Sequence, residues 1–188
     1  MIDDYFVTSN ETYAKVLIDK ESPFLRSIIL NKGSKNGIKK GMIVLDDIHL
    51  IGKVVEVNYL TSRALLASDI NSKVPVSIEP IGIQAIMSGN GKQNGILQYI
   101  NVENIKNDNE DLIVITSGAG AVYNSGIPIG TIDNEADLSN EGIPVRFYKD
   151  FTQLKYVKIL SNEKQTVDEL NKQEFESNTK EITEINNQ

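Results

Sequence analysis

The side chains of this chain that could carry acid–base or nucleophilic chemistry are few and lie far apart in the sequence. The 188 residues include one histidine and no cysteine, which excludes disulfides, thiolate metal sites and cysteine nucleophiles. An imidazole-based triad or metal site would therefore have to use His49. Asp47 lies two residues before it, beside an expected turn. This spacing places the two residues close together in the chain, but it does not indicate a catalytic pair. We interpret His49 as a surface or half-buried turn residue.

Two serines, Ser117 and Ser125, each precede a glycine and superficially resemble nucleophilic serines. A nucleophile elbow has the pattern G-x-S-x-G, yet the residues two before these serines are Ile115 and Tyr123. The small residues that follow Ser117 are better explained as a tight turn at which two backbone segments approach closely. A hydrolase remains an alternative only if the fold brings His49 beside a serine and an acid.

Three polar segments match ligand-binding loops only in part. Residues 89–91 (GNG) lack the following helix and the G-K-[ST] ending of a phosphate loop, and a hairpin explains them better. The acidic pairs at 46–47 and within residues 107–111 (NDNED) lack the central glycine and distant glutamate of a calcium loop. We therefore expect solvated loops here, and no metal or cofactor.

The formal net charge of -7 argues against a nucleic-acid partner, whose phosphates require clustered Lys and Arg. Residues 161–188 contribute seven acids and three lysines, so the rest of the chain is only mildly acidic. A small basic patch near the first glycine turns is too poor in aromatic residues for nucleic-acid binding, but docking of an acidic partner or an anionic surface stays open. The patch consists of Lys32, Lys35, Lys39 and Lys40.

The elements that must position these residues are predicted to be short strands. Apolar, often alternating segments recur about every 8–12 residues, which is typical of a β-sandwich or barrel, and no helical period persists in the body. We expect strands at 13–19, 25–31, 42–45, 50–57, 63–68, 74–78, 83–87, 95–100, 112–116, 127–132, 145–148 and 156–160. Structural turn glycines are expected at Gly33, Gly37, Gly41, Gly52, Gly118, Gly120, Gly126 and Gly130.

Composition suggests three regions along the chain. Residues 1–12 form a lead-in without the features of a signal peptide, and residues 13–160 form the β-rich body, with a soft boundary near 79–82. No run approaches the ~18 apolar residues of a spanning helix. Residues 161–188 are acidic and too poor in apolar residues to pack, which predicts a disordered tail, with a partner-docking tail as the alternative.

Five segments, taken in order, give a specific signature. They are AKVLIDKESPF (14–24), LNKGSKNGIKKGMIVL (30–45), LIGKVVEV (50–57), SRALLASDINSKVPVSI (62–78) and VITSGAGAVYNSGIPIGTI (114–132). In this order and spacing the chain resembles the rod shape-determining MreC family over about residues 12–160. The family usually has Gly-Asp before the TSG segment and a proline before the second glycine turn. This chain has Glu110-Asp111 and Asn124-Ser125 there, so the two loops depart from the family pattern.

The resemblance implies an all-β fold of two small six-stranded β-barrels, similar in topology to chymotrypsin-like protease barrels but without a catalytic triad. The two barrels are consecutive or interleaved along the chain. Family members have a cytoplasmic start, one membrane span, a coiled coil and an external barrel portion. We therefore expect this chain to be the barrel region alone, periplasmic or extracytoplasmic, and anchored to the inner membrane in the full-length protein.

The resemblance also implies a function without catalysis. Family members organise peptidoglycan-synthesis proteins of the cell-elongation machinery, contacting a class B penicillin-binding transpeptidase, MreD and copies of themselves. We expect such a scaffold, with a degenerate trypsin-like hydrolase as the runner-up and a ligand-binding barrel ranked low. The partner-contact residues stay unassigned. Sequence alone does not separate core from exposed positions among four aromatic candidates, Tyr13, Phe24, Tyr123 and Phe147, and we favour a core position for each.

Overall fold

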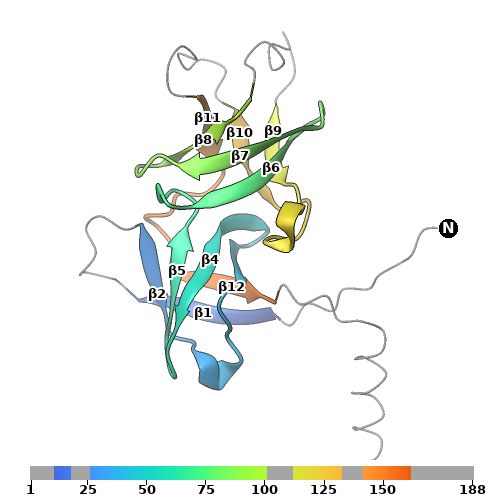
Figure 1. The fold of residues 1–188 in the computed structure, drawn as a ribbon. Coiled ribbons are helices and arrows are strands. Elements are labelled where there is room, and N and C mark those ends of the chain that lie inside the picture. The colour runs from blue at the N-terminus through green and yellow to red at the C-terminus, as the bar shows by residue number, and fades with distance from the viewer. Residues whose placement is uncertain (1–10, 18–25, 101–111, 133–141, 162–188) are drawn as a thin grey trace, which may run out of the picture. The chain divides into compact units, whose positions relative to one another are not determined.

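The computed structural model describes residues 11–17, 26–100, 112–132 and 142–161 (Figure 1). Most of the predicted lead-in and acidic tail, the predicted NDNED loop at 107–111 and Phe24 lie outside these ranges. The strands are β1 (Glu11–Leu17), β2 (Ser27–Leu30), β3 (Ile43–Asp46), β4 (His49–Val57), β5 (Ser62–Leu66), β6 (Lys73–Glu79), β7 (Ile83–Gly89), β8 (Asn94–Gln98), β9 (Ile113–Thr116), β10 (Pro128–Ile132), β11 (Ile143–Phe147) and β12 (Tyr156–Leu160). Two short 3-10 helices, η1 (Ser34–Asn36) and η3 (Ala119–Ala121), complete the described elements.

These strands form two closed antiparallel barrels of six strands each. The first has the order β1-β12-β3-β4-β5-β2, and the second has the order β10-β11-β8-β7-β6-β9. Closure pairs every strand on both sides, so the described strands leave no open sheet edge within either barrel. The predicted all-β fold with two six-stranded barrels is confirmed.

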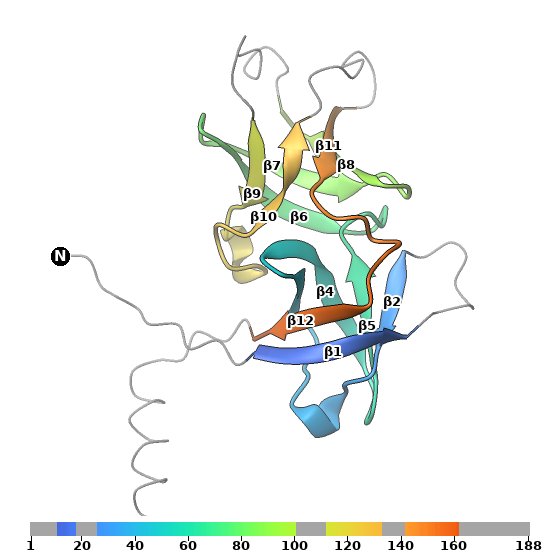
Figure 2. The ribbon, with the colours of Figure 1, turned by 180° about the vertical axis from the view of Figure 1, so that it is seen from behind.

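The second barrel is inserted into the first. Strands β1–β5 build five sixths of the first barrel, the chain then forms all of the second barrel, and β12 returns to close the first. Figure 2 shows the return, with β12 lying beside β1 after the connection from β11. The chain passes between the barrels after Leu66 and before Lys73. The predicted soft boundary at 79–82 is instead the hairpin turn between β6 and β7, where the Gly82 N–H donates to the Ile78 carbonyl.

The alternating pattern of apolar residues explains why these segments are strands. In β5 and β6, buried residues alternate with more exposed ones, because successive side chains of a strand point to opposite faces. Each predicted segment overlaps an observed strand. Two residues join β3 to β4, since Asp46 pairs with His49, and Asp47 has a φ of 59° in this turn. Aspartate tolerates this left-handed conformation better than most residues do.

Two of the predicted turn glycines lie within strands. Gly52 is in β4 and Gly130 is in β10, whereas Gly37, Gly41, Gly118, Gly120 and Gly126 have the positive φ values of turns. A Cβ at Gly52 would overlap the carbonyl oxygen of Leu65 on the paired strand β5. Gly52 therefore permits a close approach of two backbones. From the sequence alone, a glycine with this role cannot be distinguished from a turn glycine.

Two clusters of buried side chains stabilise the barrels. One cluster fills the first barrel, with Leu30, Val44, Ile51, Ala64 and Ile159 among its members. The larger cluster fills the second barrel and also includes residues of the first, as described below.

We predict that Gly52→Ala lowers the free energy of unfolding by about 3 kcal/mol or more, because the new methyl group forces β4 away from the backbone of β5. Gly37→Asn is the control. Gly37 has a φ of 76° and open space around a built Cβ, and asparagine accepts this conformation, so we expect a loss below about 1 kcal/mol. Urea unfolding measures both. An unchanged midpoint for Gly52→Ala would contradict the close approach.

Candidate functional site

His49 starts β4 and lies opposite Asp46 of β3. Its ring contacts that of Tyr148, with centroids 5.1 Å apart and planes tilted by 58°. Nδ1 is buried and has no hydrogen-bond partner among the residues that the structure describes, and the Asp46 carboxylate instead pairs with Lys149 Nζ at 3.2 Å. Among the described residues no serine or threonine oxygen bonds to His49, so this geometry does not support the hydrolase alternative.

Ser117 and residues 89–91, which the sequence offered as possible functional groups, make hydrogen bonds that stabilise turns. The Ser117 N–H donates to the Pro75 carbonyl at 3.0 Å, and Ser117 Oγ accepts from the Ala119 N–H at 3.3 Å. Residues 89–91 belong to the β7–β8 hairpin, where Asn90 Oδ1 accepts the N–H groups of Lys92 (2.8 Å) and Asn94 (3.3 Å). Within the described ranges no three His, Asp or Glu residues are grouped as metal ligands.

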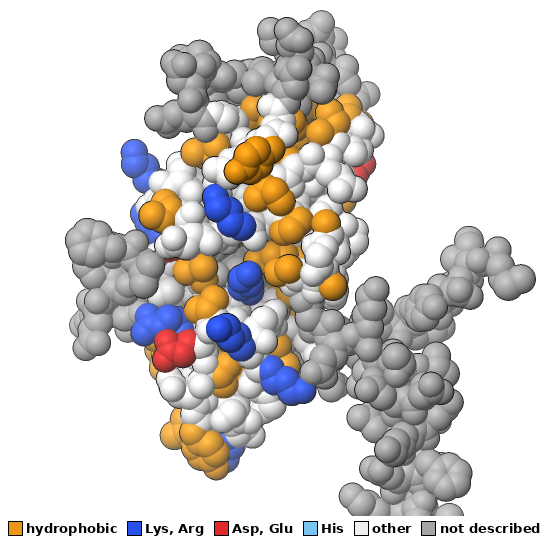
Figure 3. All heavy atoms as spheres, in the orientation of Figure 1, with side chains coloured by type: hydrophobic (Ala, Val, Ile, Leu, Met, Phe, Trp, Pro, Cys, Tyr) orange, Lys and Arg blue, Asp and Glu red, His pale blue; other side chains and the backbone are white. Residues whose placement is uncertain are grey.

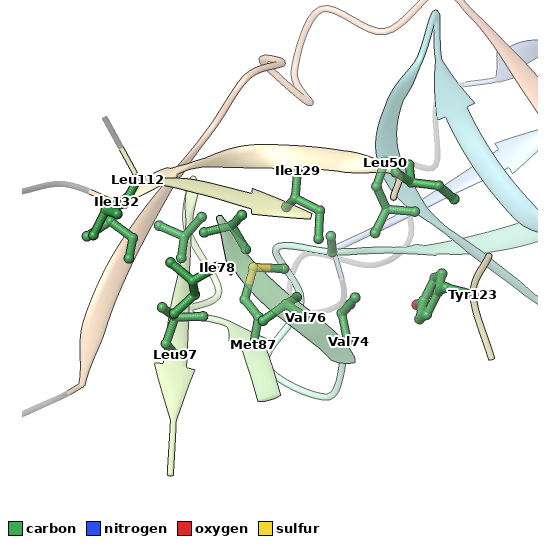
Figure 4. Close-up of a cluster of buried hydrophobic side chains, with 14 of the residues drawn as sticks. Leu50, Val74, Val76, Ile78, Met87, Leu97, Leu112, Tyr123, Ile129 and Ile132 are labelled. Carbon is green, nitrogen blue, oxygen red and sulfur yellow. The ribbon is translucent and has the colours of Figure 1, made fainter. Parts of the chain in front are cut away.

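Hydrophobic side chains of both barrels meet in one cluster at the barrel junction. Ile43 and Leu50 of the first barrel belong to the same buried cluster as Ile129 of the second. Figure 4 shows Leu50 on β4 near the end of β10 that carries Ile129, while Tyr123, a member of the same cluster, stands apart from them in this view. Because burying apolar surface stabilises both barrels at once, the junction acts as a common core.

Polar contacts also join the barrels. The backbone N–H of Arg26, just before β2, donates to Asp69 Oδ2 at 2.9 Å, and its Nε donates to the Gly91 carbonyl at 3.0 Å. The Gly91 N–H in turn donates to the Ser68 carbonyl at 2.9 Å. A Cβ at Gly89 would overlap the backbone of Ser68 and Asp69, so the β7–β8 hairpin lies directly against the connection from β5 to β6.

Tyr123 is the aromatic side chain at this junction. It is 3% exposed, its hydroxyl has no hydrogen-bond partner in the described part of the chain, and Lys53 Nζ lies 5.8 Å from the ring centroid. Burial raises the pKa of Tyr123 to about 12 from its ordinary value of 10.0, because the phenolate would lose its hydration. Tyr123 is therefore a core residue and not a contact for partners.

The outer side of β1 and β12 carries exposed aromatic side chains and charged ones of both signs, since Lys158 Nζ pairs with Glu11 Oε1 at 3.3 Å, and we call it the β1–β12 face. Tyr13 pairs with Lys158 and Lys15 pairs with Tyr156, so these side chains share one side of the sheet. Tyr13 is 65% exposed, so the core position that we favoured from the sequence is wrong for this residue, and Tyr156 is 63% exposed. Among the other aromatic candidates, Phe147 is half-buried.

The described part of the chain is basic, although the whole chain is acidic. It contains fourteen Lys and Arg residues and seven Asp and Glu residues, a net charge of +7. Figure 3 shows one face on which basic side chains lie among hydrophobic ones and acidic side chains are sparse. The remaining segments hold nineteen acids and five lysines, so a prediction from total charge misses this basic surface.

The fold and these surfaces define a class, namely two interleaved antiparallel barrels with a common core and an exposed aromatic and basic exterior. Residues 16–161 match the family model for the rod shape-determining protein MreC, barrel core. The chain is also 31% identical over 150 residues to the cell shape-determining protein MreC of Cereibacter sphaeroides, covering 77% of this chain and 47% of that relative. The chain therefore belongs to the MreC family and spans about half the length of this relative.

Solved structures share the fold. MreC from Pseudomonas aeruginosa has a TM-score of 0.70 and 25% identity, covering 81% of this chain and 99% of that one. The major periplasmic domain of the cell shape-determining filament MreC gives a TM-score of 0.67 at 18% identity, covering 82% and 99%. The complex between penicillin-binding protein PBP2 and MreC from Helicobacter pylori gives 0.56 at 16% identity, covering 79% and 98%. In the described residues of this chain, no helix has the length and hydropathy needed to cross a membrane.

We predict that alkaline pH destabilises the fold partly through Tyr123. Below pH 10 the phenol is neutral in both states, so its burial has no pH-dependent cost. Between pH 10 and about 12 the unfolded chain loses this proton while the folded chain keeps it, which lowers the free energy of unfolding by up to about 2–3 kcal/mol. Tyr123→Phe should lose less stability over this window than the parent chain. Urea unfolding at pH 8, 10 and 11.5 measures the difference, with Tyr99→Phe as the exposed control.

Proposed function

We propose that this chain is the barrel portion of a non-enzymatic scaffold that organises peptidoglycan-synthesis proteins during cell elongation. The observation that carries this proposal is the match of residues 16–161 to the MreC barrel core, together with the confirmed two-barrel fold. The His49 ring contacts the Tyr148 ring, and its Nδ1 has no hydrogen-bond partner within the described ranges. Both observations support a structural role for the histidine.

The first proposed partner is a class B penicillin-binding transpeptidase. The Helicobacter pylori relative was solved as a complex with PBP2, and this supports the same kind of partner for the present chain. We also propose binding to MreD and to other rod-complex proteins, and self-association into a homo-oligomer. The description of a related structure as a filament supports the last of these.

We propose that the barrels work outside the cytoplasm, in a protein anchored to the inner membrane. The relative described as a major periplasmic domain supports this location. The chain covers 47% of the Cereibacter sphaeroides relative, so more than half of that relative's length lies outside the matched region.

The β1–β12 face is the surface that we propose for the transpeptidase contact. Aromatic residues are enriched at protein interfaces, because they bury a large apolar area and keep a polar end for hydrogen bonding. Tyr13 and Tyr156 are diagonal neighbours on adjacent strands, and rigid strands hold them in place in the free protein.

We predict that the full chain binds the purified extracytoplasmic part of a class B transpeptidase from the same source. The double variant Tyr13→Ala with Tyr156→Ala should weaken binding at least about tenfold, or about 1.4 kcal/mol, as measured by biolayer interferometry. Tyr99→Ala is the matched control, because Tyr99 is 91% exposed at the end of β8 in the second barrel.

Two results would count against these proposals. If crosslinking detects neither self-association nor binding to any elongation protein, the proposed scaffold function is wrong. If the double variant binds as tightly as Tyr99→Ala, the contact lies elsewhere and the β1–β12 face is not the site.

A further inference from the structure

The hairpin turn between β4 and β5 carries two large apolar side chains that lie in solvent. Tyr59 is 65% exposed and Leu60 is 59% exposed, and they are the two central residues of the turn. The Asn58 N–H donates to the Thr61 carbonyl at 2.8 Å and closes the turn around them. Short hairpin turns favour glycine, asparagine and aspartate, so the local backbone does not explain this apolar pair. We call residues 58–61 the β4–β5 tip.

The β4–β5 tip lies at the end of the first barrel that is remote from the barrel junction. Strand β4 runs from the junction, where Leu50 joins the common core, to Val57 beside the tip. Strand β5 leads from the tip back to Leu66, after which the chain enters the second barrel. At about 3.3 Å per residue, β4 places the tip roughly 25 Å from the junction. Figure 1 shows the tip at the lower end of these two strands, away from the second barrel.

The loop between β2 and β3 packs against the β4–β5 tip and fixes its backbone. The Ser34 N–H donates to the Asn58 carbonyl at 2.9 Å. The Lys35 N–H donates to the Tyr59 carbonyl at 3.1 Å. A Cβ at Gly33 would overlap the carbonyl oxygens of both Asn58 and Tyr59, so the two backbones are in direct contact. The exposed apolar pair and this loop therefore form one surface.

The loop that packs against the tip is basic. Residues 31–42 include four lysines and no acid, and the tip itself is uncharged. Three of the lysines are exposed and one is half-buried, namely Lys35, Lys39, Lys40 and Lys32 in that order. Glu56, two residues before the tip, pairs with Arg63 Nε at 3.4 Å. The lysines thus give the surface around the tip an excess of positive charge.

Protruding apolar side chains beside a cluster of lysines are complementary to an anionic lipid surface. The apolar groups enter the headgroup region of a bilayer, while the lysines stay at the level of the lipid phosphates. Each lysine near an anionic bilayer strengthens binding by about fivefold. An acidic protein would also attract the lysines, but it would need a matching pocket for Tyr59 and Leu60. A bilayer accepts them without one, so the lipid surface is the better fit.

We propose that the β4–β5 tip and the adjacent lysine loop dock the first barrel on a bilayer that has anionic headgroups. Tyr59 and Leu60 enter the interface, and the four lysines contact lipid phosphates. The proposal goes beyond the scaffold function and is independent of the transpeptidase contact, because the β1–β12 face lies on other strands.

Tryptophan fluorescence of the full chain tests this proposal. The chain has no tryptophan, so Leu60→Trp introduces a single indole at the tip. Ile48→Trp is the matched control, because Ile48 is 56% exposed in the β3–β4 turn, at the opposite end of β4. We predict that phosphatidylglycerol vesicles shift the emission of Leu60→Trp to shorter wavelength and leave that of Ile48→Trp unchanged. Tyr59→Trp is a second reporter and should behave as Leu60→Trp does.

Charge reversal tests the role of the lysines. In the Leu60→Trp background, Lys35→Glu with Lys40→Glu should weaken vesicle binding at least about tenfold. The control, Lys92→Glu with Arg146→Glu, reverses two charges in an open groove of about 270 Å³ that Arg26 also lines, at the barrel junction. At ~0.1 M salt the Debye length is about 10 Å, so this remote change should alter binding less than about twofold. Urea unfolding midpoints close to that of the parent chain confirm that the variants fold.

Four outcomes would overturn the proposal. If neither tip reporter shifts, the tip does not enter a bilayer and a protein partner is the remaining reading. An equal shift of Ile48→Trp would show adsorption without a preferred surface. Equal effects of the two double reversals would show that the loop lysines do not direct binding. A concentration-dependent shift before lipid is added would assign the tip to a second copy of the chain.

Discussion

The pairing of β12 with β1 and β3 is the constraint on which the rest of the structure depends. Glu11 lies opposite Leu160, so the first barrel closes only when the two ends of the described chain meet. Closing so long a loop has a high entropic cost. Closure of the barrel is also slow, because the chain loses this entropy before the non-local contacts form and stabilise the fold. The inserted second barrel lowers the cost, since folding it brings β11 and the connection to β12 near the first barrel.

The barrel junction follows from this insertion. A chain that leaves the first barrel after β5 and returns before β12 crosses the junction twice, and both crossings contribute contacts. The first crossing carries Asp69, which holds Arg26, and the second carries Lys149, which pairs with Asp46 of the first barrel. Apolar residues such as Leu50 and Ile129 fill the space between the two barrels, so the junction is part of the hydrophobic core of the second barrel.

Sequence patterns predict the strands of this fold better than its surfaces. Period-two alternation marks strands such as β5 and β6, which have one buried side, whereas β3 is buried on both sides and shows a short continuous apolar run instead. The role of Gly52 was not predictable, since its requirement for glycine comes from Leu65 across the sheet. Arg26, Lys92 and Arg146 are isolated in the sequence, and only the three-dimensional fold brings them to one groove. The net charge of the whole chain likewise does not reveal that the described residues are basic, because the remaining segments are acidic.

The antiparallel pairing of β1 with β12 has a mechanical consequence. Because Glu11 is opposite Leu160, a tension applied between these two residues acts at one end of the ladder and opens its hydrogen bonds one after another. Such peeling needs less force than sliding two strands past each other, where all the bonds resist together. While the pair holds, no load reaches the second barrel, because its strands all lie within the loop that the pair closes. The first barrel is thus the weak link under load, and the second is shielded by its place in the chain.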